Sequence, residues 1–568
     1  MTDVLLPLAI AVPIVAATLP IALGLRYDDV GWPIAAVATT AVVGIAAAIV
    51  AEVAVGGRFT HALGTYQPPI GIELVADRLS AAVLALIAVV SLATLAFSRV
   101  AGPRGNPFYA AYLLLVAGLC GMALTGDLFN MFVFLEIVGI TTYALIAADR
   151  SGASAYASLK YLVVGTVGAS LYLVGVGYAF LATGTLNMVD MREQILAQAS
   201  YTDPLIQASY ALIVAGLALK IALFPVHAWQ PDAYQRAPDA VTAVVAALVS
   251  TTSAYALIRV SYTVFTVDFL AANDAIATGL LVVSGTSILA GSVLAAMQSD
   301  LKRMFAYSSV AQFGMIGAAV ALANETALLG GIVHLIGHGL LKFGLFLGVG
   351  TLALGYGIRR IEDAASAARE APFTAGAIAL LGLGLVGIPP SVGFLGKWYI
   401  GVGAVESTMA GGGAAGIAVA AVIFVSTLFT LSYVARLIER FYFAGVGIPG
   451  GHGGDAAAGH GSAGGHDNDP AGVAADGGHE SDEDHESGGE PGRDDSAAVA
   501  DSSGDDASDE AAPVTPVEGA PRPSLVPDRV PPASLAVLIL TALVTVALGF
   551  GGFALFEWFG PYLTEVFA

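Results

Sequence analysis

The chain has 568 residues, of which 57% are hydrophobic and only 12% are charged, and its mean hydropathy is +0.78. Soluble domains carry about 25% charged residues, so this composition excludes an ordinary soluble protein and predicts a polytopic membrane protein. The net charge is −21, of which −16 lies between residues 450 and 530, where there are 19 acidic and 3 basic residues. Such an acidic chain does not suit nucleic acid as a partner.

Apolar segments of about 20 residues have the length of bilayer-spanning helices. Residues 1–25 have no basic segment before their apolar run, so they are predicted to be the first span and not a signal peptide. Low lysine with abundant Asp, Ala and Val suggests a salt-accumulating halophile. The 14 predicted spans are residues 4–25, 33–52, 74–98, 108–125, 127–147, 159–182, 205–225, 239–261, 273–297, 303–322, 327–354, 373–402, 414–443 and 533–556.

Basic residues in the connecting segments predict the orientation of these helices. The connections after odd-numbered helices carry most of the arginines and lysines, whereas the others offer little beyond Arg58, Arg192 and Arg259. The N-terminus is therefore expected outside the cell membrane, and the acidic segment is expected in the cytoplasm.

Glu136 lies in the middle of the fifth predicted helix, in DLFNMFVFLEIVGITTYALI. A lysine on a neighbouring helix is expected to keep this carboxylate ionised at membrane depth, and Lys220 is the candidate. Buried ion pairs are poor stabilisers, which favours a functional pair over static packing. Lys160, at the start of the sixth helix, is equally compatible with an interfacial anchor and with proton transfer.

The stretch LALKIALFPVHAWQPDAYQRAP places Lys220 inside the apolar seventh helix. Lysines at membrane depth usually face a partner or a water-filled cavity. Pro225 removes a backbone donor and breaks the helix, and only protein or water can satisfy the freed carbonyls in lipid. These features favour an ion pathway over a snorkelling lysine beside a packing kink. His227 follows the break and is a secondary candidate for gating or accepting protons.

His334, His338 and Lys342 occur at positions i, i+4 and i+8 in HLIGHGLLKFGLFL. This spacing lines one helix face with proton-exchanging groups about 6 Å apart. Histidine titrates near neutral pH, so two stacked imidazoles suit a proton relay. A single buried histidine is usually a satisfied core residue, but two histidines and a lysine on one stripe favour function.

Lys397 follows a second helix break, at Pro389 and Pro390 in GLVGIPPSVGFLGKWYI. This arrangement resembles Lys220 and Pro225, and paired broken helices are typical of transporter repeats. We therefore predict two inverted repeats of five helices each. The predicted division is residues 1–107 for helices one to three, 108–261 for the first repeat, 262–448 for the second repeat and 531–568 for the last helix.

Residues 449–530 are rich in Gly, Ala, Asp, Ser and Pro, with almost no large apolar residue. Such a segment cannot bury enough surface to fold, so it is predicted to be a disordered cytoplasmic loop. The spacings of its histidines match no structured metal site, and the chain has no cysteine cluster or nucleotide motif. We therefore predict neither a metal nor a cofactor.

Six segments resemble the proton-conducting antiporter-like subunits shared by respiratory complex I and Mrp-type cation/proton antiporters. They are LFNMFVFLEI, SLKYLVVG, ALKIALFPVHAWQPDAYQRAP, QSDLKRMFAYSSVAQFGMIG, HLIGHGLLKFGLFL and IPPSVGFLGKWYI, within residues 70–440. The resemblance implies an all-α core of about fourteen transmembrane helices, with two inverted repeats and broken helices seven and twelve. It also implies that the proton-relay positions of the family fall on Glu136, Lys220, His334, His338, Lys342 and Lys397.

The chain departs from this family at the eighth helix, where members commonly carry a central lysine. The matching segment reads STTSAYALIR, and the position falls near Thr251. Either hydroxyls and water bridge the gap between Lys220 and the histidines, or this chain does not conduct through its centre; we favour the bridged path. Lysine at position 397 and a chain that ends after the fourteenth helix resemble the Mrp-type antiporter members of the family, specifically their D-type component.

We therefore expect a proton-translocating subunit of a multisubunit Na⁺/H⁺ antiporter, which is a secondary transporter and not an enzyme. Its partners would be other membrane subunits, protons, Na⁺ and the lipid bilayer. Separation of Glu136 from Lys220 would eject the lysine's proton, which would then pass along the eleventh-helix stripe to Lys397. The alternatives are a proton-pumping subunit of a complex I-type NADH/quinone oxidoreductase or membrane-bound hydrogenase, and a scaffold that has lost transport.

Overall fold

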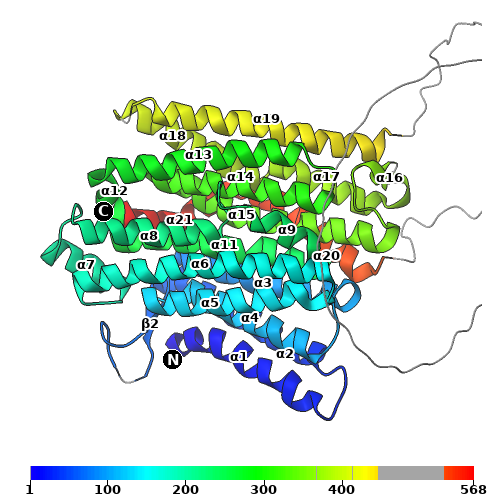
Figure 1. Ribbon diagram of the computed structural model, residues 1–568, viewed down its shortest axis with the longest axis horizontal. Helices are drawn as coiled ribbons and strands as arrows, with labels where there is room; N and C mark the ends of the chain where they lie inside the picture. The colour runs from blue at the N-terminus through cyan, green and yellow to red at the C-terminus, as the bar shows by residue number, and fades with distance from the viewer. Residues whose placement is uncertain (1, 65, 366, 412, 445–529, 568) are drawn as a thin grey trace, which may run out of the picture. The chain divides into compact units, whose positions relative to one another are not determined.

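The computed structural model describes residues 2–64, 66–365, 367–411, 413–444 and 530–567. Within these ranges, 12 helices are long and apolar enough to cross a membrane, and two shorter apolar helices accompany them. The helices lie side by side in one bundle (Figure 1). This multi-pass helical architecture confirms the predicted fold class. The acidic segment predicted at 449–530 lies, apart from its last residue, outside the described ranges.

Polar caps and glycines set many of the helix ends. α3 (Arg78–Ala101) begins after Asp77, whose carboxylate accepts hydrogen bonds from the backbone N–H groups of the first turn. α6 (Gly152–Thr183) ends before Gly184, which has a φ of +74°, a conformation that favours glycine. The remaining elements of the first part of the chain are η1 (Thr2–Val4), α1 (Leu5–Gly24), α2 (Gly31–Gly56), β1 (Phe59–Ala62), β2 (Glu73–Ala76), α4 (Asn106–Leu124), α5 (Leu128–Ile146), η2 (Ala147–Asp149), α7 (Met188–Gln198), α8 (Pro204–Lys220) and α9 (Trp229–Arg236).

The second part of the chain continues the same bundle. Its eighth span is not a uniform α-helix, because two π-helical stretches, η3 and η4, interrupt it. Such interruptions often occur at functional sites. The elements are α10 (Asp239–Val244), η3 (Val245–Val249), α11 (Ser250–Arg259), η4 (Val260–Phe265), α12 (Thr266–Ala272), α13 (Asp274–Ala296), α14 (Leu301–Ala321), α15 (Glu325–Tyr356), η5 (Glu362–Ala364), α16 (Ala367–Glu370), α17 (Pro372–Val386), α18 (Val392–Met409), α19 (Ala415–Tyr442), α20 (Pro532–Phe550) and α21 (Gly552–Phe567).

Two spans are broken near prolines. α8 ends at Lys220 and the chain resumes as α9 at Trp229, while α17 ends at Val386 and α18 begins at Val392. The sequence predicted a helix as far as residue 225, which is five residues too long. The reason is that a proline ring clashes with the turn before it and offers no N–H to that turn. The N–H of Phe224, directly before the proline, donates to the Ser287 hydroxyl at 3.1 Å.

Each broken span packs against a helix of 32 residues, α8 against α6 and α18 against α15. Small residues permit this close packing. A Cβ added at Gly168 of α6 would lie 3.1 Å from the carbonyl oxygen of Gly216 in α8. A Cβ added at Gly396 of α18 would lie 2.7 Å from the Cα of His334 in α15. Two repeats would produce this pairing, and the repeat boundaries themselves stay a prediction.

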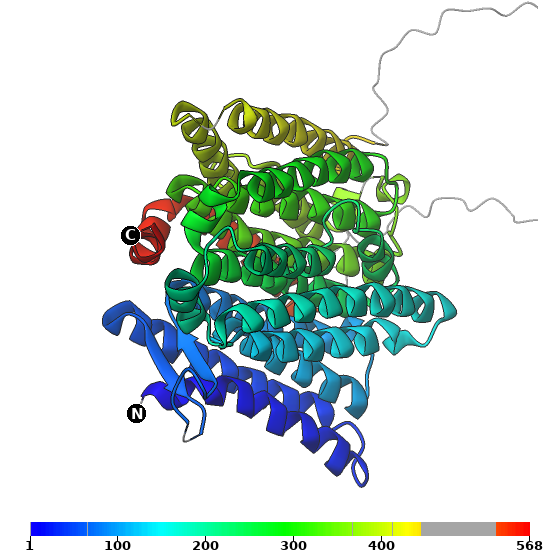
Figure 2. The same cartoon turned by 60° about the vertical axis from the view of Figure 1, so that its left-hand side comes forward.

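One end of the bundle carries elements that the sequence did not predict. β1 and β2 form an antiparallel hairpin in which Phe59 is opposite Ala76, and α3 therefore begins at Arg78 and not at residue 74. The last predicted span, 533–556, is two helices, α20 and α21. The hairpin and α21 lie at the same end (Figure 2), which we call the hairpin end. Short strands and amphipathic helices give no hydropathy signal of spanning length.

Candidate functional site

Glu136 on α5 and Lys220 at the end of α8 meet, as the sequence predicts. The Lys220 Nζ lies 3.5 Å from the Glu136 Oε1, and Lys220 is only 2% exposed. Among the described residues, neither of these two atoms has a hydrogen-bond partner. The pair is therefore an electrostatic contact without a directional bond, and each group can bond to something else.

The Tyr143 hydroxyl shares the space around this ion pair. A Cβ added at Gly139 would lie 3.0 Å from the Tyr143 Oη and 3.1 Å from the Lys220 Nζ, so both atoms lie against the same glycine. The hydroxyl is buried and makes no hydrogen bond to any described residue. Sequence reasoning missed Tyr143, although it follows Glu136 by two helical turns and so lies on the same face of α5.

Lys160 belongs to a different cluster. Its Nζ lies 2.5 Å from the Asp232 Oδ2 on α9, and the Arg303 Nη1 lies 2.8 Å from the Oδ1 of the same carboxylate. All three side chains are partly exposed. His227, in the break after α8, stacks on Phe224 with ring centroids 5.2 Å apart. Lys160 and His227 thus have contacts with residues other than Glu136 and Lys220.

His334, His338 and Lys342 line one face of α15 and are buried. The two imidazole centroids are 6.1 Å apart, and no described residue hydrogen-bonds to any of their four ring nitrogens. The Lys342 Nζ donates to the Phe305 carbonyl oxygen at 2.6 Å and also to the Ser308 hydroxyl. This stripe thus combines one hydrogen-bonded ammonium with two buried imidazoles that have no hydrogen-bond partner among the described residues.

Lys397 lies where α17 ends. Its Nζ donates to the carbonyl oxygens of Leu385 and Val386, at 2.8 and 3.0 Å. A cation is favourable at a helix C-terminus, where carbonyls lack intrahelical partners. The preceding residue, Gly396, packs directly on His334. The second helix break therefore holds its lysine beside the stripe of α15.

The centre of the bundle contains hydroxyl and amide groups. Thr251, on α11, is buried, and its hydroxyl has no partner within the part of the chain that the structure describes. The same holds for the hydroxyl of Thr252 and for both amide atoms of Gln312 on α14. The basic residue of the eighth span is Arg259. The charge pattern predicted it in a connecting segment, which is wrong, because Arg259 is buried inside the span.

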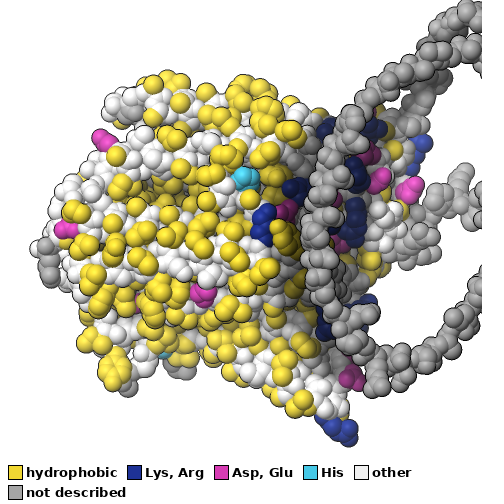
Figure 3. All heavy atoms as spheres, viewed as in Figure 1, with side chains coloured by type: hydrophobic (Ala, Val, Ile, Leu, Met, Phe, Trp, Pro, Cys, Tyr) yellow, Lys and Arg dark blue, Asp and Glu magenta, His cyan; other side chains and the backbone are white. Residues whose placement is uncertain are grey.

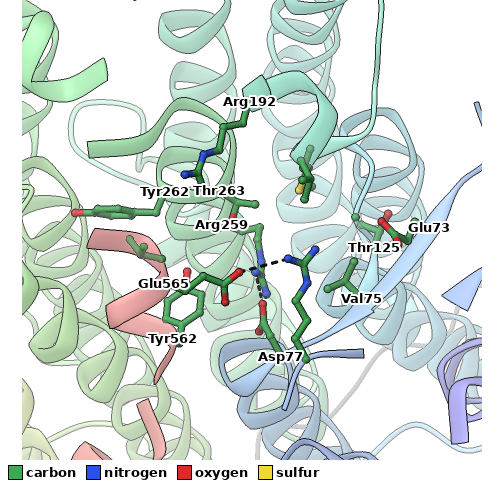
Figure 4. Close-up of a pocket in the computed structure, with 15 residues that line it drawn as sticks. Glu73, Val75, Asp77, Thr125, Arg192, Arg259, Tyr262, Thr263, Tyr562 and Glu565 are labelled. Atoms are coloured by element: carbon green, nitrogen blue, oxygen red, sulfur yellow. Dashed lines mark hydrogen bonds and ion pairs between the residues drawn. The ribbon is translucent and has the colours of Figure 1, made fainter. Parts of the chain in front are cut away.

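Arg259 is part of a polar cavity at the hairpin end (Figure 4). Its Nη2 lies 2.9 Å from the Asp77 Oδ1, and it also bonds to the other carboxylate oxygen. Burial raises the pKa of the Asp77 carboxyl, but the charge and hydrogen bonds of Arg259 lower the pKa more, so the net shift is downward. Tyr562 and Glu565 of α21 line the same cavity, which has a volume of about 40 Å³. This volume is large enough for water, because a single water needs about 10–15 Å³.

A second polar cavity, of about 330 Å³, lies where α10 and α14 begin. The Lys302 Nζ lies 2.9 Å from the Asp239 Oδ1 and donates to the Ala237 carbonyl oxygen at 2.7 Å. Arg359 also approaches Asp239, at 3.6 Å. We call this end of the bundle the basic end. On the face shown in Figure 3, hydrophobic side chains are spread along the bundle and basic side chains gather toward one end.

Comparison with known proteins gives consistent matches. Residues 125–428 match the family described as the transmembrane region of NADH:quinone oxidoreductase and Mrp antiporters. The N-type component of the NADH-quinone oxidoreductase of Desulforudis audaxviator is 40% identical, and the match covers 79% of this chain and 87% of that protein. The D-type component of the Na(+)/H(+) antiporter of Alkalihalophilus pseudofirmus is 32% identical, with 60% and 68% covered. A chain of the Mrp complex from Dietzia sp. has a TM-score of 0.77 and 26% identity, with 100% and 97% covered.

Proposed function

Because the chain belongs to the NADH:quinone oxidoreductase/Mrp antiporter transmembrane family, we propose that it is the proton-translocating subunit of a multisubunit Na⁺/H⁺ antiporter. Membership makes it an antiporter-like membrane subunit of the Mrp or complex I type. The antiporter choice is supported by the fold similarity to the Mrp complex, which extends over 100% of this chain. The relative from Alkalihalophilus pseudofirmus, which is named as part of a Na(+)/H(+) antiporter, supports Na⁺ as the exchanged cation.

The contact between Glu136 and Lys220 carries this proposal. The two charges lie 3.5 Å apart without a hydrogen bond, and Lys220 is buried whereas the Glu136 side chain is 26% exposed. A buried charge that loses its partner is strongly destabilised. When a conformational change draws Glu136 away, the isolated ammonium therefore gives up its proton. When the carboxylate returns, it favours a newly protonated lysine, and the cycle can repeat.

The proton released from Lys220 passes toward α15 and then to Lys397. His338 and His334 accept and donate protons in turn, since a neutral imidazole carries one donor and one acceptor nitrogen. Lys342 sets the positive potential at one end of the stripe, and Lys397 receives the proton beside the α17 carbonyls. The repeats at 108–261 and 262–448 each supply one broken helix, so each half of the path has one lysine at a helix break.

We further propose that the N-terminus and the hairpin end face the outside of the cell membrane. The basic end would then face the cytoplasm, because basic residues concentrate in cytoplasmic segments of membrane proteins. The cavity around Asp239 and Lys302 would be the cytoplasmic mouth of the protein. Other membrane subunits would cover the flanks of the bundle.

The test is Na⁺-driven proton flux in vesicles that contain the whole purified complex. Lys220→Ala should abolish flux because no group remains to carry the proton. Lys220→Arg is the matched variant: it keeps the charge opposite Glu136, but a guanidinium does not release its proton in proteins. Both variants should be inactive, and the arginine variant should assemble normally. Wild-type flux in either variant would remove Lys220 from the mechanism.

A redox-driven proton pump is the second candidate, and one observation favours it. The relative from Desulforudis audaxviator, which is named as part of an NADH-quinone oxidoreductase, is 40% identical and is covered over 87% of its length. In such an assembly, electron transfer in partner subunits would move Glu136 and Lys220 apart. The purified complex separates the two candidates, since an antiporter moves protons when given a Na⁺ gradient alone. A redox pump moves protons only when an electron donor and a quinone are supplied.

A further inference from the structure

Three fully buried side chains form a hydrogen-bonded cluster at the centre of the bundle. The Gln230 Nε2 on α9 donates to the Tyr234 Oη at 3.1 Å and to the Ser250 Oγ at 3.4 Å. The Tyr234 and Ser250 hydroxyls also bond to each other, at 3.2 Å. We call these residues the central cluster. Ser250 begins α11 and directly precedes Thr251, where the sequence lacks the expected lysine.

The central cluster lies between the elements that carry the two halves of the proposed path. On one side, Trp229 donates its indole N–H to the Leu219 carbonyl oxygen at 2.8 Å, so the start of α9 is tied to the residue before Lys220. On the other side, the Tyr234 ring lies 5.6 Å from the Phe346 ring of α15. Phe346 in turn lies 6.2 Å from Phe305, whose carbonyl binds Lys342. The cluster thus lies between the seventh-helix break and the stripe.

Polar atoms around the cluster require further partners. The Gln230 Oε1 is buried and has no hydrogen bond to any described residue, and whichever way the amide is turned, one of its polar atoms is left over. The hydroxyls of Thr251 and Thr252 are likewise buried and have no hydrogen bond to any described residue. A buried polar atom that stays unsatisfied destabilises the fold, and ordered water normally satisfies buried groups of this kind. The centre of the bundle therefore favours a hydrogen-bonded chain that includes water.

We propose that the Tyr234 and Ser250 hydroxyls carry protons between Lys220 and the α15 histidines, in place of a central lysine. This inference rests on the proposed function and names the link that the proposed path lacks. A hydroxyl has one hydrogen to give and two lone pairs to accept with. When a proton arrives at one lone pair, the hydroxyl's own hydrogen leaves to the next acceptor. One proton enters, one leaves, and each hydroxyl remains neutral after it rotates back.

Gln230 has a different role in this link. Its amide neither gains nor loses a proton, but its Nε2 holds both hydroxyl oxygens at hydrogen-bond distance. It is therefore a positioning residue. Its replacement should slow transfer by disordering the two hydroxyls, whereas loss of the hydroxyls removes the carriers themselves.

The chain provides a matched control for the tyrosine. Tyr210 on α8 is also fully buried, and its hydroxyl pairs with the Ser261 hydroxyl of the same eighth span at 3.1 Å. Ser261 lies in η4, whereas Ser250 of the central cluster begins α11. The Tyr210→Phe and Tyr234→Phe variants therefore remove the same chemical group from similar surroundings, and only the second should interrupt the proposed path.

The experiment compares these variants in vesicles that contain the whole complex, with Lys220→Arg measured in parallel. Tyr234→Phe should lower proton flux by about a hundredfold, the scale of a lost proton-transfer group, while Tyr210→Phe should retain it. Adding Thr251→Lys to Tyr234→Phe should restore flux, because the lysine supplies a proton carrier at the same place. If Tyr234→Phe does not assemble, Ser250→Ala removes the adjoining hydroxyl and decides the question in the same way.

The outcomes distinguish the two proposals. Full flux in Tyr234→Phe together with no flux in Lys220→Arg would overturn the central cluster as the link and leave the proposed function standing. Equal losses of proton flux in Tyr234→Phe and Tyr210→Phe would also overturn it, since that result would mean that both substitutions act by disturbing the packing. Full flux in Lys220→Arg would remove Lys220 from the mechanism and the link with it, whereas the absence of Na⁺-driven flux in the wild-type complex would overturn the proposed function itself.

Discussion

At the scale of single residues, hydrogen bonding distinguishes Lys220 from other buried lysines. Lys302 and Lys220 are both buried lysines, but the Lys302 ammonium has a carboxylate and a carbonyl at hydrogen-bond distance. The Lys220 ammonium has only a 3.5 Å contact. A fully bonded buried charge is held in place, whereas a partly bonded one can change partners.

The Tyr143 hydroxyl gives the first test at this scale. Tyr143→Phe should slow proton flux by about tenfold or more, because it removes the hydroxyl that lies beside Lys220. It should leave the thermal stability of the complex unchanged or raise it, since a buried hydroxyl without a partner contributes nothing and costs desolvation. Flux in vesicles and thermal unfolding in detergent measure the two effects. Unchanged flux in this variant would mean that Tyr143 only fills space.

Asp77 gives a second test at this scale. Asp77→Asn should destabilise the protein by about 3–5 kcal/mol, because it leaves Arg259 buried without its counter-charge. The pKa of Asp77 lies below its ordinary value of 3.8, so its contribution is complete at neutral pH. The contribution is lost as the pH falls below about 3.8 toward the lower pKa of the folded state.

Thermal unfolding of the purified complex as a function of pH measures this contribution. Wild type should lose stability in acid through a component that Asp77→Asn lacks, and at low pH the two proteins should converge. If the stabilities of the two proteins decrease in parallel as the pH falls, this would contradict a stabilising role for the Asp77–Arg259 pair.

At the scale of elements, each broken span is positioned by packing against a long helix, α8 against α6 and α18 against α15. α18 presents Gly396 to α15, and this contact sets the distance between Lys397 and the stripe. The position of a lysine at a helix break is therefore decided by packing on another helix and not by the break alone. Overpacking such a contact generally costs about 1–3 kcal/mol.

Gly396→Ala tests this packing. The added methyl group would lie 2.6 Å from the Cβ of His334 and 2.7 Å from its Cα, so α18 must move away from α15. We expect a loss of about 1–3 kcal/mol in stability and a decrease in flux. Gly401→Ala, on the same helix, is the control because a Cβ there would meet nothing within 4 Å. Equal behaviour of the two variants would show that the α15–α18 contact does not control transport.

At the scale of the whole molecule, the two ends of the bundle differ in character. The hairpin end is closed by the hairpin and α21, where the Arg58 Nη1 lies 3.4 Å from the Glu565 Oε1. The basic end carries Lys302, Arg359 and a larger polar cavity. In the proposed transport path, this asymmetry would give each side of the membrane a distinct mouth.

Cysteine labelling in intact cells tests the proposed orientation. In a Cys120→Ala background, Gln67→Cys at the hairpin end should react with an impermeant reagent added outside. Arg360→Cys at the basic end should react only after the membrane is opened. Both positions are exposed, so accessibility to reagent, and not burial, decides the outcome. The reverse labelling pattern would place the N-terminus in the cytoplasm.

The sequence by itself determined the membrane class, most of the spans, the two helix breaks and the family. These follow from local quantities, namely hydropathy over about 20 residues, the missing N–H of proline and short motifs. It also placed Glu136 opposite Lys220, because a buried carboxylate needs a cation. Only the tertiary structure decided that Lys160 pairs with Asp232, that Arg259 is buried against Asp77, and that Tyr234 joins Ser250 at the centre. Those contacts link helices far apart in the chain, and helix packing in three dimensions, which no local pattern encodes, sets them.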